Sequence, residues 1–147
     1  MLLQHERIWI TGAQGQVGSA FARMLDTTEL DVLLTDRDEV DITNMDEVRA
    51  YVEMNRPDVI INCAGICGIA FCEENSDLAY KVNAIGARNL SVAARSVHAE
   101  MVQISTDLRA HAGFRIWEIQ AGGRGICENH RAPLSDHPQL LGLRKRG

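Results

Sequence analysis

Short apolar runs alternate with amphipathic segments along the first two thirds of the chain. Residues 7–11 form an apolar run that stops at a glycine, as a buried strand does. Apolar residues then recur at helical spacing from Gln16 to Leu25, and Asp31–Thr35 forms a second apolar run. Strands that alternate with helices in this way favour an α/β fold with a doubly wound parallel sheet, covered on both faces.

The same alternation continues as far as Asp107. Thr43 is expected to cap a helix that ends before Pro57, because threonine accepts hydrogen bonds from the free amides of a first helical turn. The further elements predicted are a brief third strand at 40–43, a helix to Asn55, a strand at Val59–Asn62, one long or two abutting helices over 73–97, and a fifth strand at 101–105.

The sequence changes character after Asp107. Residues 108–147 hold six of the twelve glycines and two of the three prolines, and they contain no tyrosine. Apart from the run Phe114–Ile119 they show no helical or strand periodicity, which is typical of poorly packed chain. We therefore expect a truncated α/β unit over residues 1–107 and an irregular tail over residues 108–147.

Composition and charge exclude several classes of protein. A chain of 147 residues with 46% hydrophobic and 24% charged residues is typical of one globular domain. The net charge of -5 gives no electrostatic attraction for nucleic acid or an anionic membrane. No stretch approaches the roughly 18 apolar residues of a membrane span, and the first residues lack the order of a signal peptide. We expect a cytoplasmic location.

The cysteines do not form a recognisable metal site. Cys63, Cys67 and Cys72 lie close together in the sequence, but they include no C-x2-C pair and have no histidine at ligand spacing. Reduced structural thiols are the expected state, and no metal is predicted.

A glycine pattern joins the first strand to the first helix. Gly12, Gly15 and Gly18 follow the spacing G-x-x-G-x-x-G, in which the glycines permit a tight turn, close approach of a diphosphate and close packing of the helix. The helix adds free N–H groups and the positive end of its dipole. Because the pattern lies between a strand and a helix, it predicts a dinucleotide-binding loop. The expected phosphate-binding residues are Gly12, Gln14, Gly15, Gln16, Val17 and Gly18.

The end of the second strand predicts where the adenosine binds. Asp36 stands where a carboxylate binds the ribose hydroxyls, which favours NAD. Arg37 follows directly and suits a 2′-phosphate, so NADP remains the alternative. Ala64 and Gly65 are small, as close approach to a ligand requires. The other positions expected beside the cofactor are Asp41, Ile42, Cys63, Ala64 and Gly65.

These motifs resemble the extended short-chain dehydrogenase/reductase family, and within it the dTDP-4-dehydrorhamnose reductases. The resemblance covers about residues 7–107. It implies a Rossmann-type fold and the NAD(P)H-dependent reduction of a 4-keto sugar nucleotide in dTDP-L-rhamnose biosynthesis. The matching segments are Thr11–Gly18, Asp41–Ile42, Arg56–Gly65, Val82–Asn83 and Ile104–Asp107.

The resemblance also implies roles for single residues. Thr106 matches the catalytic Ser/Thr that hydrogen-bonds the substrate carbonyl, and Ser105 and Asp107 flank it at the strand end. Asn83 lies in the helix that supports the site. Phe71 stands where relatives carry an aspartate, so substrate contacts there are expected to differ.

The proton donor of this family is missing from the chain. Reduction of a ketone needs a tyrosine in a Tyr-x-x-x-Lys motif, and Tyr51 and Tyr80 are the only tyrosines here. Leu108 follows Asp107 where relatives have a tyrosine, and the region that binds their substrate is absent. As written, the chain is expected to be inactive as a reductase.

Several hypotheses explain this departure. One is that a single extra base sits after the Asp107 codon, so that CTA-CGN, read as Leu108 and Arg109, would restore to TAC-GN and give tyrosine. The same shift over Gly142–Lys145 would read Val-Tyr-Gly, and the gene sequence decides whether the codons allow it. The alternatives are a non-catalytic dinucleotide-binding module or regulatory subunit, a truncated product without function, and a fragment of another epimerase or reductase of the extended family. An unfinished sheet is also expected to associate through its exposed edge, including as a homo-oligomer.

Overall fold

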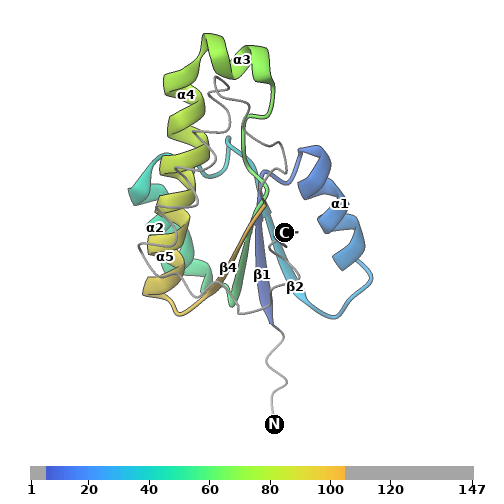
Figure 1. Ribbon diagram of the computed structural model, residues 1–147. Helices are drawn as coiled ribbons and strands as arrows, with labels where there is room; N and C mark the ends of the chain where they lie inside the picture. The colour runs from blue at the N-terminus through green and yellow to red at the C-terminus, as the bar shows by residue number, and fades with distance from the viewer. Residues whose placement is uncertain (1–5, 105–147) are drawn as a thin grey trace, which may run out of the picture.

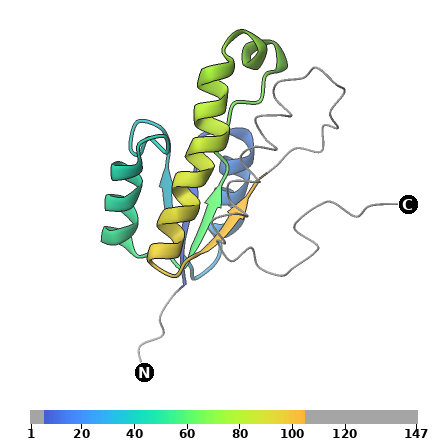
Figure 2. The same ribbon diagram turned by 60° about the vertical axis from the view of Figure 1, so that its left-hand side comes forward.

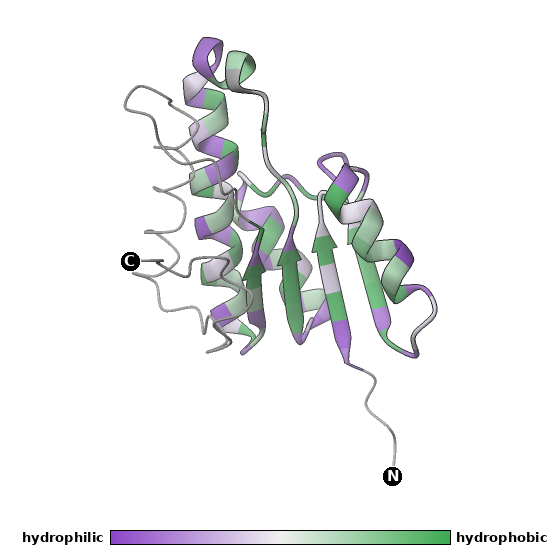
Figure 3. Cartoon of the chain, turned by 45° about the vertical axis from the view of Figure 1, so that its right-hand side comes forward, coloured by the Kyte–Doolittle hydropathy of each residue, from purple (hydrophilic) through white to green (hydrophobic). Residues whose placement is uncertain are grey.

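The computed structural model describes residues 6–104, which contain a four-stranded parallel sheet in the order β2-β1-β3-β4. β1 (Arg7–Thr11) pairs with β2 (Asp31–Thr35) on one side and with β3 (Val59–Asn62) on the other. β4 (Glu100–Gln103) pairs with β3. Helices cover both faces of the sheet (Figure 1), and the strands carry mainly hydrophobic residues (Figure 3). The predicted α/β fold with a doubly wound parallel sheet is confirmed.

Alternating side chains of β1 supply both halves of the core. Ile8 and Ile10 pack with Ile61 on the face covered by α1 (Gln16–Leu25). Trp9 points to the opposite face, where its indole Nε1 donates to Thr35 Oγ1 at 2.9 Å in a buried hydrogen bond. A parallel strand that is buried on both faces reads as a continuous apolar run, which is why 7–11 was recognisable.

The helix after β2 begins one residue later than predicted. α2 (Met45–Asn55) is capped by Asn44, whose side chain accepts hydrogen bonds from the amides of Asp46 and Glu47. The prediction that Thr43 caps this helix was therefore wrong. The Thr43 hydroxyl donates to Asp41 Oδ1 instead, at 2.7 Å.

Residues 40–43 form a turn rather than the short third strand expected, so β4 is the fourth strand of the described residues and not a fifth. The C-terminal end of α2 agrees with the sequence. Arg56 adopts a left-handed conformation with φ of 47° and Pro57 follows it, which ends the helix.

The predicted helical region 73–97 is longer and more divided than expected. It contains α3 (Ile69–Glu74), α4 (Ser76–Tyr80), the π-helix η1 (Lys81–Gly86) and α5 (Ala87–Ser96). The last three run without a break as one long helix beside the sheet (Figure 2). No helix within residues 6–104 is long and apolar enough to cross a membrane.

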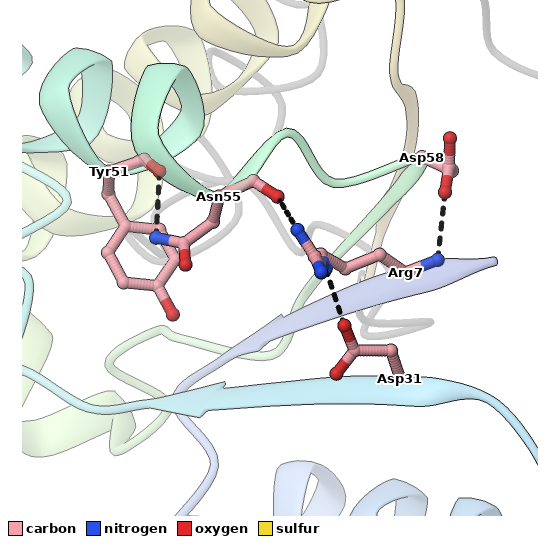
Figure 4. Close-up of polar contacts among 5 residues, drawn as sticks. All are labelled: Arg7, Asp31, Tyr51, Asn55 and Asp58. Carbon is pink, nitrogen blue, oxygen red and sulfur yellow. Dashed lines mark hydrogen bonds and ion pairs between the residues drawn. The ribbon is translucent and has the colours of Figure 1, made fainter. Parts of the chain in front are cut away.

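Arg7 ties three elements together at the amino end of β1 (Figure 4). Its guanidinium forms an ion pair with Asp31 of β2, with 2.6 Å between Nε and Oδ2, and donates to the carbonyl of Asn55 at the end of α2. Its backbone amide donates to Asp58 Oδ2 at 2.8 Å. These bonds lie at the end of the sheet opposite to the candidate site.

Candidate functional site

A cleft of about 480 Å³ opens at the carboxyl ends of β1, β2 and β3. In an open parallel sheet this edge is where ligands bind, because the loops after neighbouring strands diverge there. The lining residues come from the loops after these strands and from α4 and η1. They are Thr11, Gly12, Gln14, Gly15, Asp36, Arg37, Val40, Asp41, Ile42, Thr43, Cys63, Ala64, Gly65, Ile66, Leu78, Lys81 and Val82.

The three glycines of the first loop have different surroundings. Gly12 has φ of +65°, and a Cβ there would lie 2.6 Å from the backbone nitrogen of Ala64. A Cβ at Gly18 would lie 2.2 Å from the carbonyl oxygen of Gly12. A Cβ at Gly15 would lie 3.3 Å from that same oxygen, closer than most Cβ atoms approach a neighbour, so a side chain at Gly15 is disfavoured as well, though less strongly. All three glycines thus allow the loop to pack tightly.

The amino terminus of α1 lacks the features that stabilise the amino terminus of α2. Its N-cap is Gly15, which has no side chain to accept the first-turn amides, and its first turn contains no acidic residue. α2 has both a side-chain cap and two acidic residues in its first turn. The first amides of a helix need an acceptor from outside it, and an anion satisfies them best.

Asp36 fixes the glycine loop to the end of β2. Its carboxylate accepts the amide of Gln14 at 3.0 Å and the amide of Arg37 at 2.8 Å. Its own amide donates to Glu39 Oε2 at 2.7 Å. A carboxylate has about four acceptor positions, so capacity remains for hydroxyl donors of a ligand.

Asp41 is shaped by its neighbours in the turn before α2. The Thr43 hydroxyl on its carboxylate holds the pKa of Asp41 below its usual value, and the charges of Arg37 and Lys81 lower that pKa further. The Asp41 amide donates to Glu47 Oε2 at 2.9 Å. Asp41 is therefore an anion at neutral pH, with two cations of the cleft lining close to it.

The buried side-chain amides of Asn62 and Asn83 hold the loop after β3, which lines the cleft. Asn62 Oδ1 accepts the Thr11 hydroxyl at 2.7 Å and the Ala64 amide at 3.1 Å, and its Nδ2 donates to Gln103 Oε1 at 2.8 Å. This row links the ends of β1, β3 and β4. The carboxamide of Asn83 holds the backbone of one residue further along this loop: it accepts a hydrogen bond from the Ile66 amide at 2.8 Å and donates to the Ile66 carbonyl at 2.9 Å.

The cysteines near the cleft are free thiols with unequal exposure. Cys63 is half-buried, Cys67 is exposed and Cys72 is buried. Burial raises the pKa of the Cys63 thiol to about 11, so it is protonated at neutral pH. Within residues 6–104 no group of three His, Cys, Asp or Glu side chains is placed to hold a metal ion.

The cleft brings together ten of the positions expected from the sequence: Gly12, Gln14, Gly15, Asp36, Arg37, Asp41, Ile42, Cys63, Ala64 and Gly65. Gln16, Val17 and Gly18 lie in the first turn of α1 and are not among the lining residues. Asn83 is buried behind the wall, where its side chain is occupied by Ile66. Thr106, Ser105, Asp107 and the tail lie outside the described residues.

Sequence reasoning missed several lining residues. Ile66 lies just beyond the recognised Cys63–Gly65 segment, and Thr43 had been assigned to helix capping. Leu78 is 39% exposed and lines the cleft together with Lys81 and Val82. Only the position of α4 and η1 above the sheet edge reveals these three. Phe71, which replaces an expected aspartate, is exposed on α3 and does not line the cleft.

Known proteins share this arrangement. The family model described as the RmlD substrate binding domain matches residues 6–109. A dTDP-4-dehydrorhamnose reductase of Aggregatibacter actinomycetemcomitans is 38% identical over 148 residues, covering 94% of this chain and 50% of the relative. A GDP-L-fucose synthase of Sinorhizobium fredii is 36% identical over a shorter stretch, 46% of this chain.

A crystal structure of dTDP-4-dehydrorhamnose reductase from Bacillus anthracis in complex with NADP is 34% identical, with a TM-score of 0.80. The match covers 86% of this chain and 50% of that one. The chain thus spans about half the length of these relatives. Since the family model matches most of the chain and agrees with the motifs of the glycine loop, the chain belongs to the RmlD substrate binding domain family, with dTDP-4-dehydrorhamnose reductases as its relatives.

Proposed function

We propose that the cleft binds NAD or NADP, with the diphosphate at the amino terminus of α1 and the adenosine beside Asp36 and Ile42. The observation that carries the proposal is the uncapped first turn of α1, which follows Gly15 and contains no acidic residue. Free amides and a helix dipole are what a diphosphate requires. The residues present therefore fit the cofactor.

The choice between the two cofactors depends on opposing charges. Asp36 can accept hydrogen bonds from the ribose hydroxyls of NAD. Arg37 and Lys81 both line the same cleft and could neutralise the 2′-phosphate of NADP. The Bacillus anthracis relative was crystallised with NADP. We therefore expect both cofactors to bind.

The reaction proposed for the whole protein is reduction of a 4-keto sugar nucleotide, because the relatives are dTDP-4-dehydrorhamnose reductases. The bound cofactor would supply the hydride, and the residues of this chain would hold and orient it. Residues 1–107 would act as the cofactor-binding unit, with Thr106 bonding the substrate carbonyl.

A second candidate is a binding module without catalysis, and the tyrosines favour it. Tyr51 stacks on Trp9 in the core, with 4.5 Å between ring centroids, and Tyr80 lies exposed on α4. Neither lines the cleft. Without a tyrosine donor, this chain is expected to bind the dinucleotide and not to oxidise NADPH when a 4-keto sugar nucleotide is added.

A charge placed in the first turn of α1 tests cofactor binding. Gln16→Glu puts a carboxylate beside the proposed diphosphate and should weaken both NADPH and NADH about fivefold, as expected for roughly 1 kcal/mol of repulsion in a solvated site. The same charge favours the helix dipole, so the free energy of unfolding should rise by about 0.3–1 kcal/mol. Calorimetric titration and denaturant unfolding measure the two effects.

Thr27→Glu is the matched control, because Thr27 is exposed and follows the opposite end of α1. It adds the same charge and should leave both affinities unchanged. Equal affinity in Gln16→Glu and the unmodified chain would contradict the placement of the diphosphate. Absence of any dinucleotide binding by the unmodified chain would contradict the function itself.

A further inference from the structure

Ile42, which forms part of the cleft wall, packs on the long helix α4–η1–α5 at Gly86, where a side chain would collide with it. A Cβ at Gly86 would lie 2.6 Å from Ile42 Cδ1 and 2.8 Å from Ile42 Cγ1. Gly86 is the last residue of η1, and both it and Ile42 are buried. The Ile42 side chain therefore packs directly on the backbone of the helix.

The same helix also holds the backbone of Ile42. Asn89 lies three residues after Gly86 and thus on the same face of the helix. Its Nδ2 donates to the Ile42 carbonyl at 3.0 Å, and its side chain is only 2% exposed. The Arg88 guanidinium donates to Asn89 Oδ1 at 3.4 Å, which leaves Nδ2 directed at Ile42.

These contacts matter because residues 40–43 belong to no strand. The turn is held by the Thr43 bonds to Asp41, by the Asp41 bond to Glu47, and by the contacts of Ile42 with the helix. Val40, Asp41, Ile42 and Thr43 all line the cleft. A shift of Ile42 would move the part of the wall that Ile42 forms.

We propose that Gly86 and Asn89 are positioning residues that set the adenine-binding wall of the cleft through Ile42, although neither residue lines the cleft. The inference rests on the proposed function, in which the adenosine lies beside Ile42. It assigns to one face of the long helix a role in affinity for the adenosine end of the cofactor. Asn83, on η1, holds the neighbouring loop at Ile66 by a separate pair of bonds.

Asn89→Leu tests the hydrogen bond with a side chain of similar size. Losing one buried donor should weaken binding of ADP-ribose, which carries the adenosine and diphosphate, about tenfold. NADPH should lose the same factor. Nicotinamide mononucleotide, which lacks the adenosine, should bind the variant and the unmodified chain alike.

Two controls on the same helix separate positioning from loss of stability. Ala94→Gly weakens α5 without touching Ile42, and its ADP-ribose affinity should not change. Ser91→Ala removes a buried hydroxyl that has no hydrogen-bond partner within residues 6–104, and it should also leave affinity unchanged. If Asn89→Leu weakens ADP-ribose no more than Ala94→Gly does, the inference is wrong.

A second pair of variants tests the packing contact and still applies if Asn89→Leu does not fold. Gly86→Ala should lower ADP-ribose affinity because its Cβ displaces Ile42. In an Ile42→Ala background the same substitution should cost little, since only the Ile42 Cβ remains, at 3.6 Å. Equal losses in both backgrounds would overturn the inference. Failure of the unmodified chain to bind ADP-ribose, NADPH or NADH would instead overturn the proposed function.

Discussion

Cys63 and Cys67 lie four residues apart after β3 and differ in exposure. Cys63 is half-buried and lines the cleft, and burial raises its thiol pKa to about 11. Cys67 is exposed. Because the thiolate is the reactive form, the two residues give an internal comparison within one loop.

At pH 8 iodoacetamide should modify Cys67 well before Cys63, and Cys63 should become reactive only as the pH approaches 11 or when the chain unfolds. Peptide mapping by mass spectrometry separates both sites from Cys127. The raised pKa also makes the free energy of unfolding depend on pH. Because the folded state holds the Cys63 proton more tightly than the unfolded state does, the contribution of this thiol to stability is complete below pH 9 and declines between pH 9 and about 11. Equal labelling rates for Cys63 and Cys67 at pH 8 would contradict the burial of Cys63.

Among single residues, the sequence predicted correctly the location of those that stand at a fixed distance from a strand end. Gly12 and Asp36 each follow an apolar run directly, so their place at the sheet edge follows from the strand itself. Asn62 was recognised only as part of a motif. Its role in linking three strands depends on Thr11 and Gln103, which are distant in the sequence.

Among the elements, α2 shows how one residue decides a helix start. Asn44 accepts two first-turn amides and donates to Glu47 Oε1 at 2.8 Å, whereas Thr43 bonds Asp41. Both residues are good caps by type, so the sequence could not choose between them. The turn at 40–43 made the choice, because it uses the Thr43 hydroxyl for another bond.

Asn44→Ala should lower the free energy of unfolding by about 1 kcal/mol, as expected for loss of a helix cap. Urea denaturation followed by circular dichroism measures the change. Thr43→Ala is the comparison and should cost less stability, since it removes no bond from the helix. A larger loss in Thr43→Ala than in Asn44→Ala would return the capping role to Thr43.

The π-helix is the element that the pattern of apolar residues concealed. Its i→i+5 bonds shift the register of the helix by one residue between α4 and α5. Helical periodicity alone cannot detect such a shift within a long helix. Asn83, which contacts Ile66, and Gly86, which contacts Ile42, both lie within this π-helix.

For the whole molecule, the two faces of the sheet are covered unequally. Within residues 6–104, α1 alone covers one face, while α2 and α5 pack on the other (Figure 1). Val102 of β4 belongs to the cluster on the α1 face and is only partly buried. Parallel sheets are normally covered on both faces, so apolar surface on this side favours association.

We propose that Val102 belongs to a surface through which the chain associates at high concentration, and Val102→Lys should then reduce that association. Leu34→Lys is the control, because Leu34 is exposed on β2 at the other edge of the sheet. Sedimentation velocity across a concentration series measures the effect. Equal reduction by both variants, or a monomer at all concentrations, would contradict a surface on the β4 side.

The hydrogen-bonded side chains of Thr11, Asn62 and Gln103 restrict how the strands can move relative to one another. This row joins the last paired residues of three neighbouring strands. This side of the cleft is therefore a continuation of the sheet and not a loop that rests on it. A strand that slid along its axis would have to break this row. Segments from three distant parts of the sequence are thereby kept level with one another at the place where the cleft opens.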